Sequence, residues 1–362
     1  MTNIVRTYRS TDSSAPTLTG QMGSLLALLD ACLVNGYGSQ SAAGWTKPYT
    51  NSGNVGCYQN SATYGTGRYL SVNDNGPGAG GAREARMTGY ETLSAVATGT
   101  YPWPTYAQIA LGTTPAGALV CRKSNTADST VRAWTLIADA TVFYLFTETG
   151  DYVNPTWPLT FMFGDFFSTA PSDPYACMII GRNAENSNNV MYENWPALLN
   201  VGFQLNETMS GHFIDRMWNG VGGSVNCAKH VHYTPIWIGA GQQGGGGATG
   251  TGGNAPNYTT TTSIGNIGWN GGAPTPPFPF PNGPDGGLYM SPVWLHHNGV
   301  IRGHLKGIWA PQHLTPLNHN DTFSGMSNLV GRSFLAQMNM GYNWNGGAQG
   351  CQTIIETSTT WS

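Results

Sequence analysis

The segment Trp134-Thr-Leu-Ile-Ala-Asp-Ala-Thr-Val-Phe-Tyr-Leu-Phe146 decides the fold class of this 362-residue chain. It predicts two short strands joined by a turn at Asp139, because apolar and β-branched residues flank a residue that favours turns. Two further runs, Thr160–Phe167 and Tyr175–Gly181, continue the pattern. Their nearly continuous apolar character is typical of strands that are covered on both faces. These segments therefore predict the central part of a β fold.

Similar short runs occur on both sides of this region, separated by Gly, Asn and Pro. Their lengths and spacing predict an antiparallel β-sandwich or barrel-like fold with long Gly/Pro-rich loops. The last two runs are expected to pair around a turn at residues 342–350. The predicted strands are Arg68–Asn73, Ala85–Tyr90, Gln108–Leu111, Ala118–Arg122, Arg132–Ala138, Thr141–Thr147, Gly287–Leu295, Val300–Trp309, Ser333–Met338 and Gln352–Glu356.

Composition supports a folded, mainly β chain. Gly (50 residues) and Pro (22 residues) are frequent, which excludes long helices as the main architecture. Hydrophobic residues make up 40% and aromatic residues 11%, too many for a disordered chain. Charged residues make up only 9%, against about 25% in an average protein.

The net charge of −3 excludes the basic footprint that binding to nucleic acid requires. No apolar run approaches the roughly 18 residues of a membrane-spanning helix, and the first residues lack the apolar core of a secretory signal. We therefore expect synthesis in a cytosol without membrane insertion.

The scarcity of charge predicts a surface made polar by Asn, Thr, Ser and Gln. Such a surface suits a protein that packs against copies of itself or other neighbours, because a buried unpaired charge costs several kcal/mol. The alternative is a secreted-type β protein with a neutral hydrophilic surface. Composition does not separate the two.

One amphipathic helix is predicted at residues 21–34, where apolar residues follow helical spacing. Thr19 is the expected N-cap, and Gly36 supplies the stop. The helix either covers one end of a sheet, the favoured interpretation, or docks into a partner. In the docking hypothesis, Leu25 and Leu29 are candidate subunit contacts.

The composition changes between residues 239 and 284, where a Gly tract precedes alternating Pro and Phe. This predicts a long excursion from the core. Phe278 and Phe280 would anchor it on a neighbouring subunit, whereas the alternative is an ordinary surface loop. We expect an N-terminal helix and β domain at residues 1–150 and a C-terminal β domain at 151–362, with a single β domain as the alternative.

No group of residues in the sequence predicts a catalytic, cofactor or metal site. The Cys spacing contains no chelating pair, so we expect buried free thiols rather than zinc ligands or disulfides. The pairs His230/His232 and His296/His297 have no local carboxylate partner. The six cysteines are Cys32, Cys57, Cys121, Cys177, Cys227 and Cys351.

Acidic residues are so few that a glycosidase-like carboxylate pair would have to come from Glu148, Asp151 and Asp165, an unfavoured possibility. The glycines of residues 239–244 match the letters of a dinucleotide fingerprint. We interpret this match as accidental, because no helix follows to receive a pyrophosphate.

Several segments together resemble a family of uncharacterised structural proteins of tailed bacteriophages. The resemblance covers most of the chain and implies a virion structural protein, with no catalytic residues to transfer. Residues 242–281 look like an expansion relative to the family pattern. The segments are Tyr8–Gly20, Gly23–Gly38, Gly44–Lys47, Ala82–Arg86, Gly89–Glu91, Phe163–Phe166, Cys177–Arg182, Glu185–Ser187, Gly286–Pro292, Ile301–Gly303, Gly307–Trp309 and Glu356–Ser358.

The resemblance and the composition lead to the same hypothesis. We expect a homo-oligomeric, non-enzymatic virion component made in the bacterial host cytoplasm, which decorates or connects tail, collar or baseplate parts. The alternatives are a capsid decoration protein and a tail-tip adhesin or carbohydrate-binding module. Stacking of sugars on aromatic rings would involve Trp103, Trp157, Trp195 or Trp269 in the adhesin alternative, although burial in the core is the favoured interpretation for each. A third alternative, an enzyme that degrades the host envelope, is the least favoured.

Overall fold

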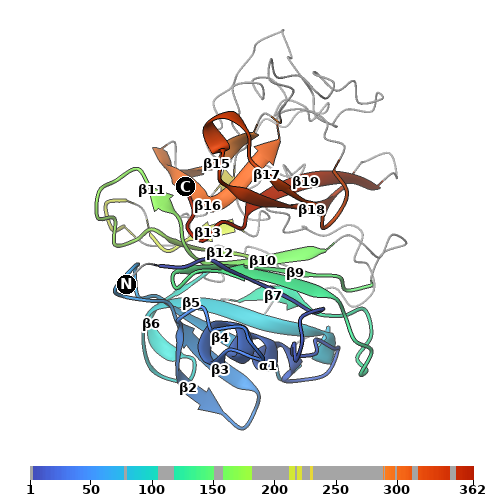
Figure 1. Ribbon diagram of the computed structural model, residues 1–362. Helices are drawn as coiled ribbons and strands as arrows, with labels where there is room; N and C mark the ends of the chain where they lie inside the picture. Colours follow the sequence, from blue (N-terminus) through green and yellow to red (C-terminus); the bar gives the residue numbers. More distant parts are fainter. Residues whose placement is uncertain are drawn as a thin grey trace, which may run out of the picture.

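The chain folds into three antiparallel β-sheets stacked in layers (Figure 1). This confirms the prediction of a mainly β fold of antiparallel sheets, and none of the three sheets closes into a barrel. The computed structural model describes residues 3–76, 80–104, 118–150, 158–181, 212–216, 218–221, 229–230, 288, 290–297, 300–311, 317–342 and 348–362.

The first layer, the N-terminal sheet, has the strand order β2-β3-β4-β5-β6, and β7 pairs with β5. The central sheet has the order β1-β8-β9-β10-β12-β13. The N-terminal sheet consists of β2 (Thr46–Asn51), β3 (Val55–Gln59), β4 (Tyr69–Asn73), β5 (Glu84–Ala95), β6 (Thr98–Trp103) and β7 (Leu119–Arg122). The central sheet consists of β1 (Arg6–Arg9), β8 (Trp134–Ala138), β9 (Val142–Thr147), β10 (Leu159–Asp165), β12 (Cys177–Ile180) and β13 (His212–Ile214).

The third layer, the C-terminal sheet, has the order β14-β15-β16-β19-β18-β17, and β11 pairs with β16. The predicted closing pair is confirmed, because β18 and β19 are paired at nine positions. This sheet consists of β11 (Phe167–Ser168), β14 (Lys229–His230), β15 (Met290–His297), β16 (Val300–Pro311), β17 (Thr322–Ser324), β18 (Ser333–Tyr342) and β19 (Ala348–Glu356). Two short 3₁₀ turns, η2 (Gly81–Arg83) and η4 (Ser327–Leu329), complete the described elements outside the helix.

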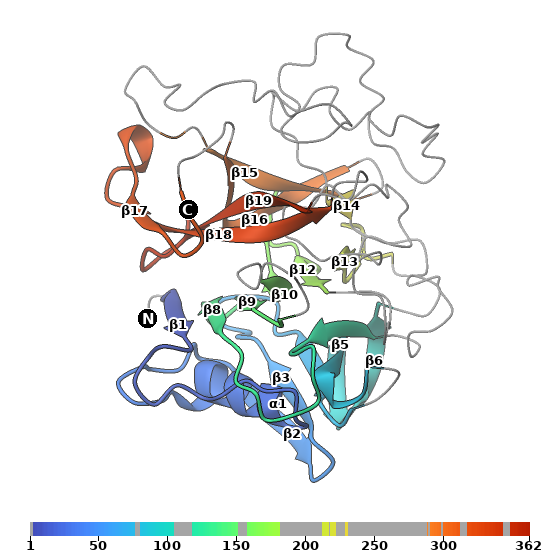
Figure 2. The same ribbon diagram turned by 90° about the vertical axis from the view of Figure 1, so that its right-hand side faces the viewer.

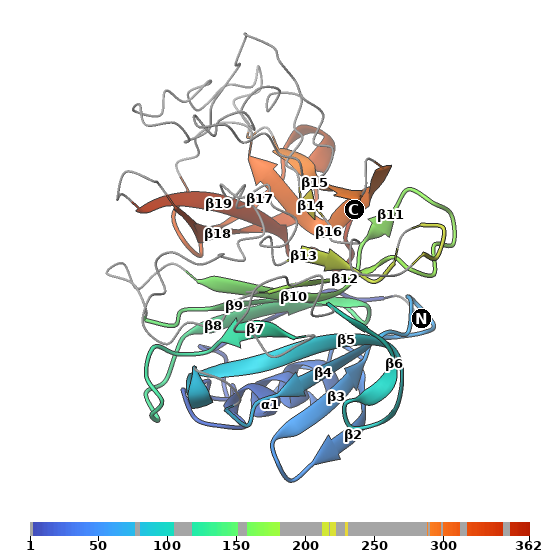
Figure 3. The same ribbon diagram turned by 180° about the vertical axis from the view of Figure 1, so that it is seen from behind.

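The central sheet is covered on both faces, as the apolar runs predict. Along β9, Phe143 and Leu145 belong to the apolar core shared with the N-terminal sheet. Val142, Tyr144 and Phe146 belong instead to the core shared with the C-terminal sheet. Every residue of β9, β10 and β12 is buried, and Figures 2 and 3 show the sheet between its two neighbours. Alternation of polar and apolar residues is absent because neither face of these strands meets water.

The predicted helix is present as α1 (Ser24–Leu29), which continues into a π-helical segment, η1 (Asp30–Asn35). It ends at Gly36, whose φ of 79° is the left-handed conformation that glycine adopts most readily. The N-cap position is occupied by Gly23 rather than Thr19, so that part of the prediction is wrong. Among the described residues, no helix is long and apolar enough to cross a membrane.

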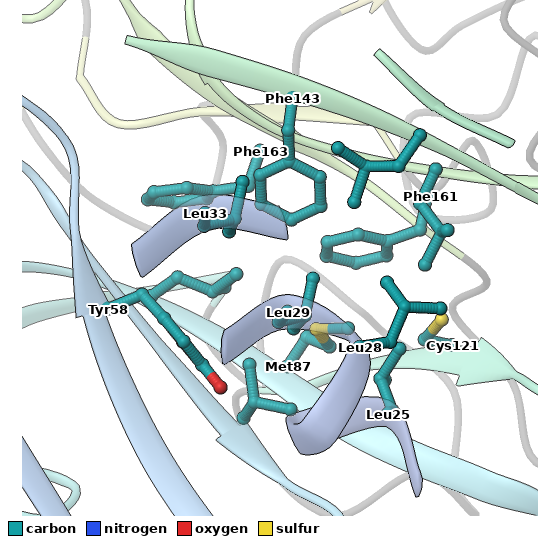
Figure 4. Packing of buried hydrophobic residues seen from close by; sticks show 14 of the residues in the cluster. Leu25, Leu28, Leu29, Leu33, Tyr58, Met87, Cys121, Phe143, Phe161 and Phe163 are labelled. Carbon is teal, nitrogen blue, oxygen red and sulfur yellow. The ribbon is translucent and has the colours of Figure 1, made fainter. Parts of the chain in front are cut away.

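The helix lies between the N-terminal and central sheets (Figure 4). Leu25 and Leu29 are both 0% exposed and pack within the core of their own chain. This corrects the hypothesis that they contact another subunit, because neither side chain has any exposed surface. Around the helix, Figure 4 shows Leu28, Leu33, Tyr58, Met87, Phe143, Phe161 and Phe163.

Strands from both sides of the predicted domain boundary share the central sheet. β9 pairs with β10 at six positions, from Leu159 opposite Thr147 to Gly164 opposite Val142. A division near residues 151–158 would therefore pass through a sheet. The excursion predicted at residues 239–284 lies outside the described residues, as does the strand predicted at Gln108–Leu111.

Candidate functional site

One third of the charged residues of this chain are buried in the part that the structure describes. Eleven of them are buried, although the whole sequence holds only 15 Lys and Arg and 18 Asp and Glu. Most of the eleven form ion pairs or accept several hydrogen bonds, as buried charges must. They are Asp74, Glu84, Arg86, Arg122, Lys123, Asp139, Asp165, Asp215, Arg302, Lys306 and Glu356.

The largest group of ion pairs lies where the three sheets meet. Arg68, just before β4, donates from Nε to Oδ2 of Asp215 over 2.6 Å. Its Nη2 donates to the carbonyl oxygen of Pro174 over 3.0 Å. Asp215 directly follows β13, so this pair joins the N-terminal sheet to the central sheet. The next residue, Arg216, donates from Nε to Glu91 of β5 and repeats the connection.

Arg302 of β16 adds the C-terminal sheet to the same group. Its Nη2 donates to Oδ2 of Asp173 over 2.6 Å, and its Nη1 donates to the carbonyl oxygen of Arg216 over 2.7 Å. The side chains of Asp173 and Arg302 are each 1% exposed. We refer to Arg68, Glu91, Asp173, Asp215, Arg216 and Arg302 as the junction network. It contains three cations and three carboxylates and links all three layers.

Asp215 is the most perturbed carboxyl of the junction network. Burial raises its pKa to about 7, against the opposing attraction of Arg68. The nearby carboxylate of Glu91 raises the pKa further. Its Oδ1 is buried and has no hydrogen-bond partner among the described residues. This oxygen can therefore carry a proton near neutral pH without breaking the bond from Arg68 to Oδ2.

Four exposed apolar side chains lie near residues of the network along the chain or, for Tyr101, in direct contact with one of them. Tyr101 of β6 is 59% exposed, and Trp218 and Val221, in the turn after β13, are 54% and 53% exposed. Ile301, adjacent to Arg302, is 48% exposed. We refer to Tyr101, Trp218, Val221 and Ile301 as the junction surface.

The Arg216 guanidinium joins the junction surface to the network beneath it. Its Cζ lies 3.6 Å from the ring centroid of Tyr101, a close cation–π contact. Tyr101 has a φ of 47°, which is rare for a bulky residue and indicates strain at that position. Neither Tyr101 nor Trp218 could be nominated from the sequence, because the pairing of β6 and the turn after β13 depend on residues far away in the chain.

A second buried ion pair fixes the start of the helix. Lys123 donates from Nζ to Oδ1 of Asp74 over 2.5 Å, and both side chains are 0% exposed. The other carboxylate oxygen of Asp74 accepts the backbone N–H of Leu25 over 2.9 Å. Lys123 also donates to the carbonyl oxygen of Gln21 over 2.7 Å. Asp74 thus satisfies a helix N–H from a distant strand end, the role that the sequence assigned to Thr19.

The acidic residues considered for a carboxylate pair are not brought together. Asp165 is at the end of β10 that pairs with Val142, whereas Glu148 follows the opposite end of β9. A strand of this length spans close to 20 Å, well beyond the 5–10 Å between the carboxyls of glycosidases. Glu148 instead lies 3.1 Å from Nε2 of His319. Asp151 lies outside the described residues.

Asp165 belongs to a buried polar group that has a structural role. Its carboxylate accepts hydrogen bonds from Asn60 and from both the backbone and the hydroxyl of Thr66, over 2.6–2.9 Å. Burial raises the pKa of Asp165, while Lys306 and these donors oppose the rise. Lys306 itself donates to Oγ1 of Thr141 over 2.8 Å. These bonds connect the loop after β3 to the central sheet and the central sheet to β16.

The described cysteines are buried free thiols, as expected for Cys32, Cys57, Cys121 and Cys177. Burial raises the pKa of the Cys32, Cys121 and Cys177 thiols well above the ordinary value. The side chains of Cys227 and Cys351 lie outside the described part of the structure.

Within the described residues, no group of three His, Cys, Asp or Glu could hold a metal ion. The side chains of His230, His232, His296 and His297 lie outside that part.

Trp103 is a core residue, 2% exposed, and its ring stacks on Phe163 at a centroid distance of 5.9 Å. It therefore offers no face to a sugar. The remaining residues that the sequence nominated for contacts, Trp157, Trp195, Trp269, Phe278 and Phe280, lie outside the described residues.

Comparison of the chain with protein-family models gives no match, and comparison with curated proteins gives none either.

Proposed function

We propose that this chain is a structural component of a tailed bacteriophage virion. It would decorate or connect tail, collar or baseplate parts through symmetric contacts with copies of itself and with other virion proteins. A structural rather than catalytic role is part of this proposal. The observation that carries it is the placement of the charges.

Because eleven charged side chains are buried, the exterior is even poorer in charge than the composition suggests. An assembly subunit must desolvate much of its surface, and each unpaired charge lost from water would cost several kcal/mol. A monomer that works alone normally keeps charged residues at 25–35% of its surface. A chain that keeps eleven of its 33 charged residues inside and has few charged residues outside is suited to repeated packing. The resemblance to phage structural proteins supports the same role.

The turn between β17 and β18 offers a rigid candidate contact. It exposes Met326 and Val330, which are 51% and 73% exposed. Arg332 holds the base of the turn by donating to Glu356 over 2.7 Å and to the carbonyl oxygen of Thr360 over 2.7 Å. A fixed apolar tip of this kind can enter a pocket on a neighbour with little loss of conformational entropy.

Mass spectrometry of gradient-purified particles of the encoding phage tests the proposal. We expect this chain at a fixed multiple of the copy number of a known tail protein, and gold-labelled antibody on the tail, collar or baseplate. Absence from purified particles would refute the proposal. Label confined to the head would refute the tail assignment and favour capsid decoration.

A matched pair of variants tests the apolar tip in phage-infected cells. Val330→Asp should lower incorporation into particles, whereas Asn328→Asp, an equal charge change on the same exposed turn, should not. Equal incorporation of both variants would show that this turn makes no contact in the particle.

A further inference from the structure

The turn after β13 contains an asparagine followed by glycine, Asn219-Gly220. This dipeptide is prone to modify itself, because asparagine is thermolabile and glycine has no Cβ to shield its backbone nitrogen from the preceding side chain. Asn219 is exposed, so water and hydroxide reach it. Trp218 and Val221 of the junction surface lie in the same turn. A chemical change at Asn219 would therefore alter the turn that carries them.

We propose that Asn219 is an autocatalytic modification site, which converts to aspartate and isoaspartate through a succinimide. Solvent base removes the proton of the Gly220 N–H, and the nitrogen attacks Cγ of Asn219. The new N–Cγ bond forms as the Cγ–Nδ2 bond breaks, and the amide takes up a proton from water and leaves as ammonia. A second water molecule opens the ring at either carbonyl. No oxidant or cofactor is needed, and the inference does not depend on the structural role proposed above.

The side chain of Asn219 is folded back over the peptide group that attacks it. Its Oδ1 accepts the N–H of Val221 over 3.1 Å, so the carboxamide turns toward the intervening nitrogen of Gly220. The same N–H stabilises the negative charge that develops on Oδ1 when the nitrogen adds to Cγ. Two reacting groups held together in one turn do not have to meet by diffusion.

The two nitrogen atoms that change their bonding make no hydrogen bond with other described residues. This holds for the backbone nitrogen of Gly220 and for Nδ2 of Asn219. The attacking nitrogen can therefore lose its proton to solvent without first breaking a bond, and nothing retains the leaving amide. The turn itself stays in place because Arg216 Nη1 donates to the carbonyl oxygen of Gly220 over 2.8 Å.

A matched dipeptide elsewhere in the described residues, Asn35-Gly36, has the opposite arrangement. Asn35 is also exposed and is the last residue of η1. The N–H of Gly36, however, donates to the carbonyl oxygen of Ala31 over 2.8 Å. Attack on Cγ of Asn35 would first have to break this helical hydrogen bond. The fold therefore protects one of two dipeptides that are identical in sequence.

The modification would change both the charge and the length of the turn. Either product adds a carboxylate three positions from Arg216. Isoaspartate also adds a methylene to the backbone before Gly220, which packs so closely on Tyr175 that an added Cβ would lie 3.0 Å from the tyrosine oxygen. A lengthened backbone would disturb this packing or the bond from Arg216. The junction surface would then differ between fresh and aged protein.

Peptide mapping by mass spectrometry of the full-length protein, aged at pH 8, tests this proposal. Aging in urea gives the intrinsic rate of each dipeptide in the unfolded chain. We expect Asn219 to react in the native protein at least as fast as in the unfolded chain. Asn35 should react about fivefold or more slowly in the native protein than in the unfolded chain, as expected for one backbone hydrogen bond. Enzymatic methylation of isoaspartate identifies the second product.

Two variants serve as controls. Asn219→Gln should abolish the modification at this position and leave the rate at Asn35 unchanged. Asn219→Asp should co-elute on anion exchange with the aspartate form of the aged wild type.

Two outcomes would overturn the proposal. One is a rate at Asn219 in the native protein well below its rate in the unfolded chain. The other is the same native-to-unfolded ratio at Asn35 and Asn219, which would show that the fold does not select between them. The assay uses purified protein and no phage particles, so failure here leaves the virion proposal to its own test.

Discussion

Asp74 and Lys123 allow the role of the buried charges to be measured. Removing one member of a fully buried pair leaves the other charge uncompensated, which costs about 3–5 kcal/mol. Asp74→Leu also removes the acceptor of the Leu25 N–H, which adds about 1 kcal/mol. We therefore expect Asp74→Leu to lower the free energy of unfolding by about 4–6 kcal/mol and Lys123→Met to lower it by about 3–5 kcal/mol.

The double variant separates the pair from its parts. Burial raises the pKa of Asp74 and lowers that of Lys123, each against the attraction of its partner, so desolvation offsets much of the attraction. Replacing both residues with apolar ones should then cost only about 1–3 kcal/mol, mainly for the lost cap. Urea unfolding followed by Trp fluorescence and circular dichroism gives the four free energies. Additive losses in the double variant would refute the reasoning.

Two controls belong to this cycle. Asp74→Asn keeps an amide oxygen for the Leu25 N–H, so it should lose the charge pairing but not the cap. Asp128→Asn changes an exposed carboxylate, and its amide oxygen can still accept the N–H of Thr130, so its effect on stability should be small beside that of Asp74→Asn.

The remaining predictions concern pH, cavities and thiols. The pKa of Asp215 is raised to about 7 in the folded protein, so the folded state holds the proton more tightly than the unfolded state does. The stability gained from this protonation is fully present below pH 4 and is lost as the pH rises to 7. The wild type should therefore lose roughly 4 kcal/mol relative to Asp215→Asn over that range, and ¹³C NMR should show the carboxyl titrating near pH 7; an ordinary pKa would contradict this. Phe161→Ala, at a buried site, should lower the free energy of unfolding in urea by about 3–5 kcal/mol. Val330→Ala, at an exposed site, should lower it by less than about 0.5 kcal/mol. Similar losses for the two variants would contradict the burial of Phe161 and the exposure of Val330. A thiol reagent at pH 8 should leave the buried thiols unmodified in the native protein and should label them after unfolding. Peptide mapping identifies the labelled cysteines, and labelling of the native protein would contradict their burial. These thiols are Cys32, Cys57, Cys121 and Cys177.

The central sheet could be predicted from the sequence because its physical requirement is local. Strands covered on both faces must be apolar at every position, and β9 and β10 meet this condition within single short segments. The helix was predictable for the same reason, since its apolar spacing and its terminal Gly36 are local features.

The parts that could not be predicted depend on contacts between distant residues. β2 has alternating and exposed positions, so its identity as a strand comes from pairing with β3 rather than from its own pattern. The helix cap comes from Asp74, 49 positions after Leu25. The sequence favoured packing of the helix on a sheet over docking into a partner, but the position of the central sheet was needed to place Leu25 in the core.

The candidate site was missed for a related reason. A low content of charged residues does not show where those residues lie in the fold. The junction network brings six of them together from segments of all three sheets. Trp218 lies in a short turn that Arg216 closes, a contact that depends on the folded position of β13. Sequence patterns predict burial for tryptophan in general, as Trp103 confirms.

The proposed virion role is tested most directly by a cryo-electron microscopy reconstruction of the intact phage particle at a resolution that separates β-sheets. The proposal predicts a repeated three-layer density that fits this chain, arranged symmetrically in the tail, collar or baseplate. Complete assignment of the tail, collar and baseplate density to other proteins would contradict it.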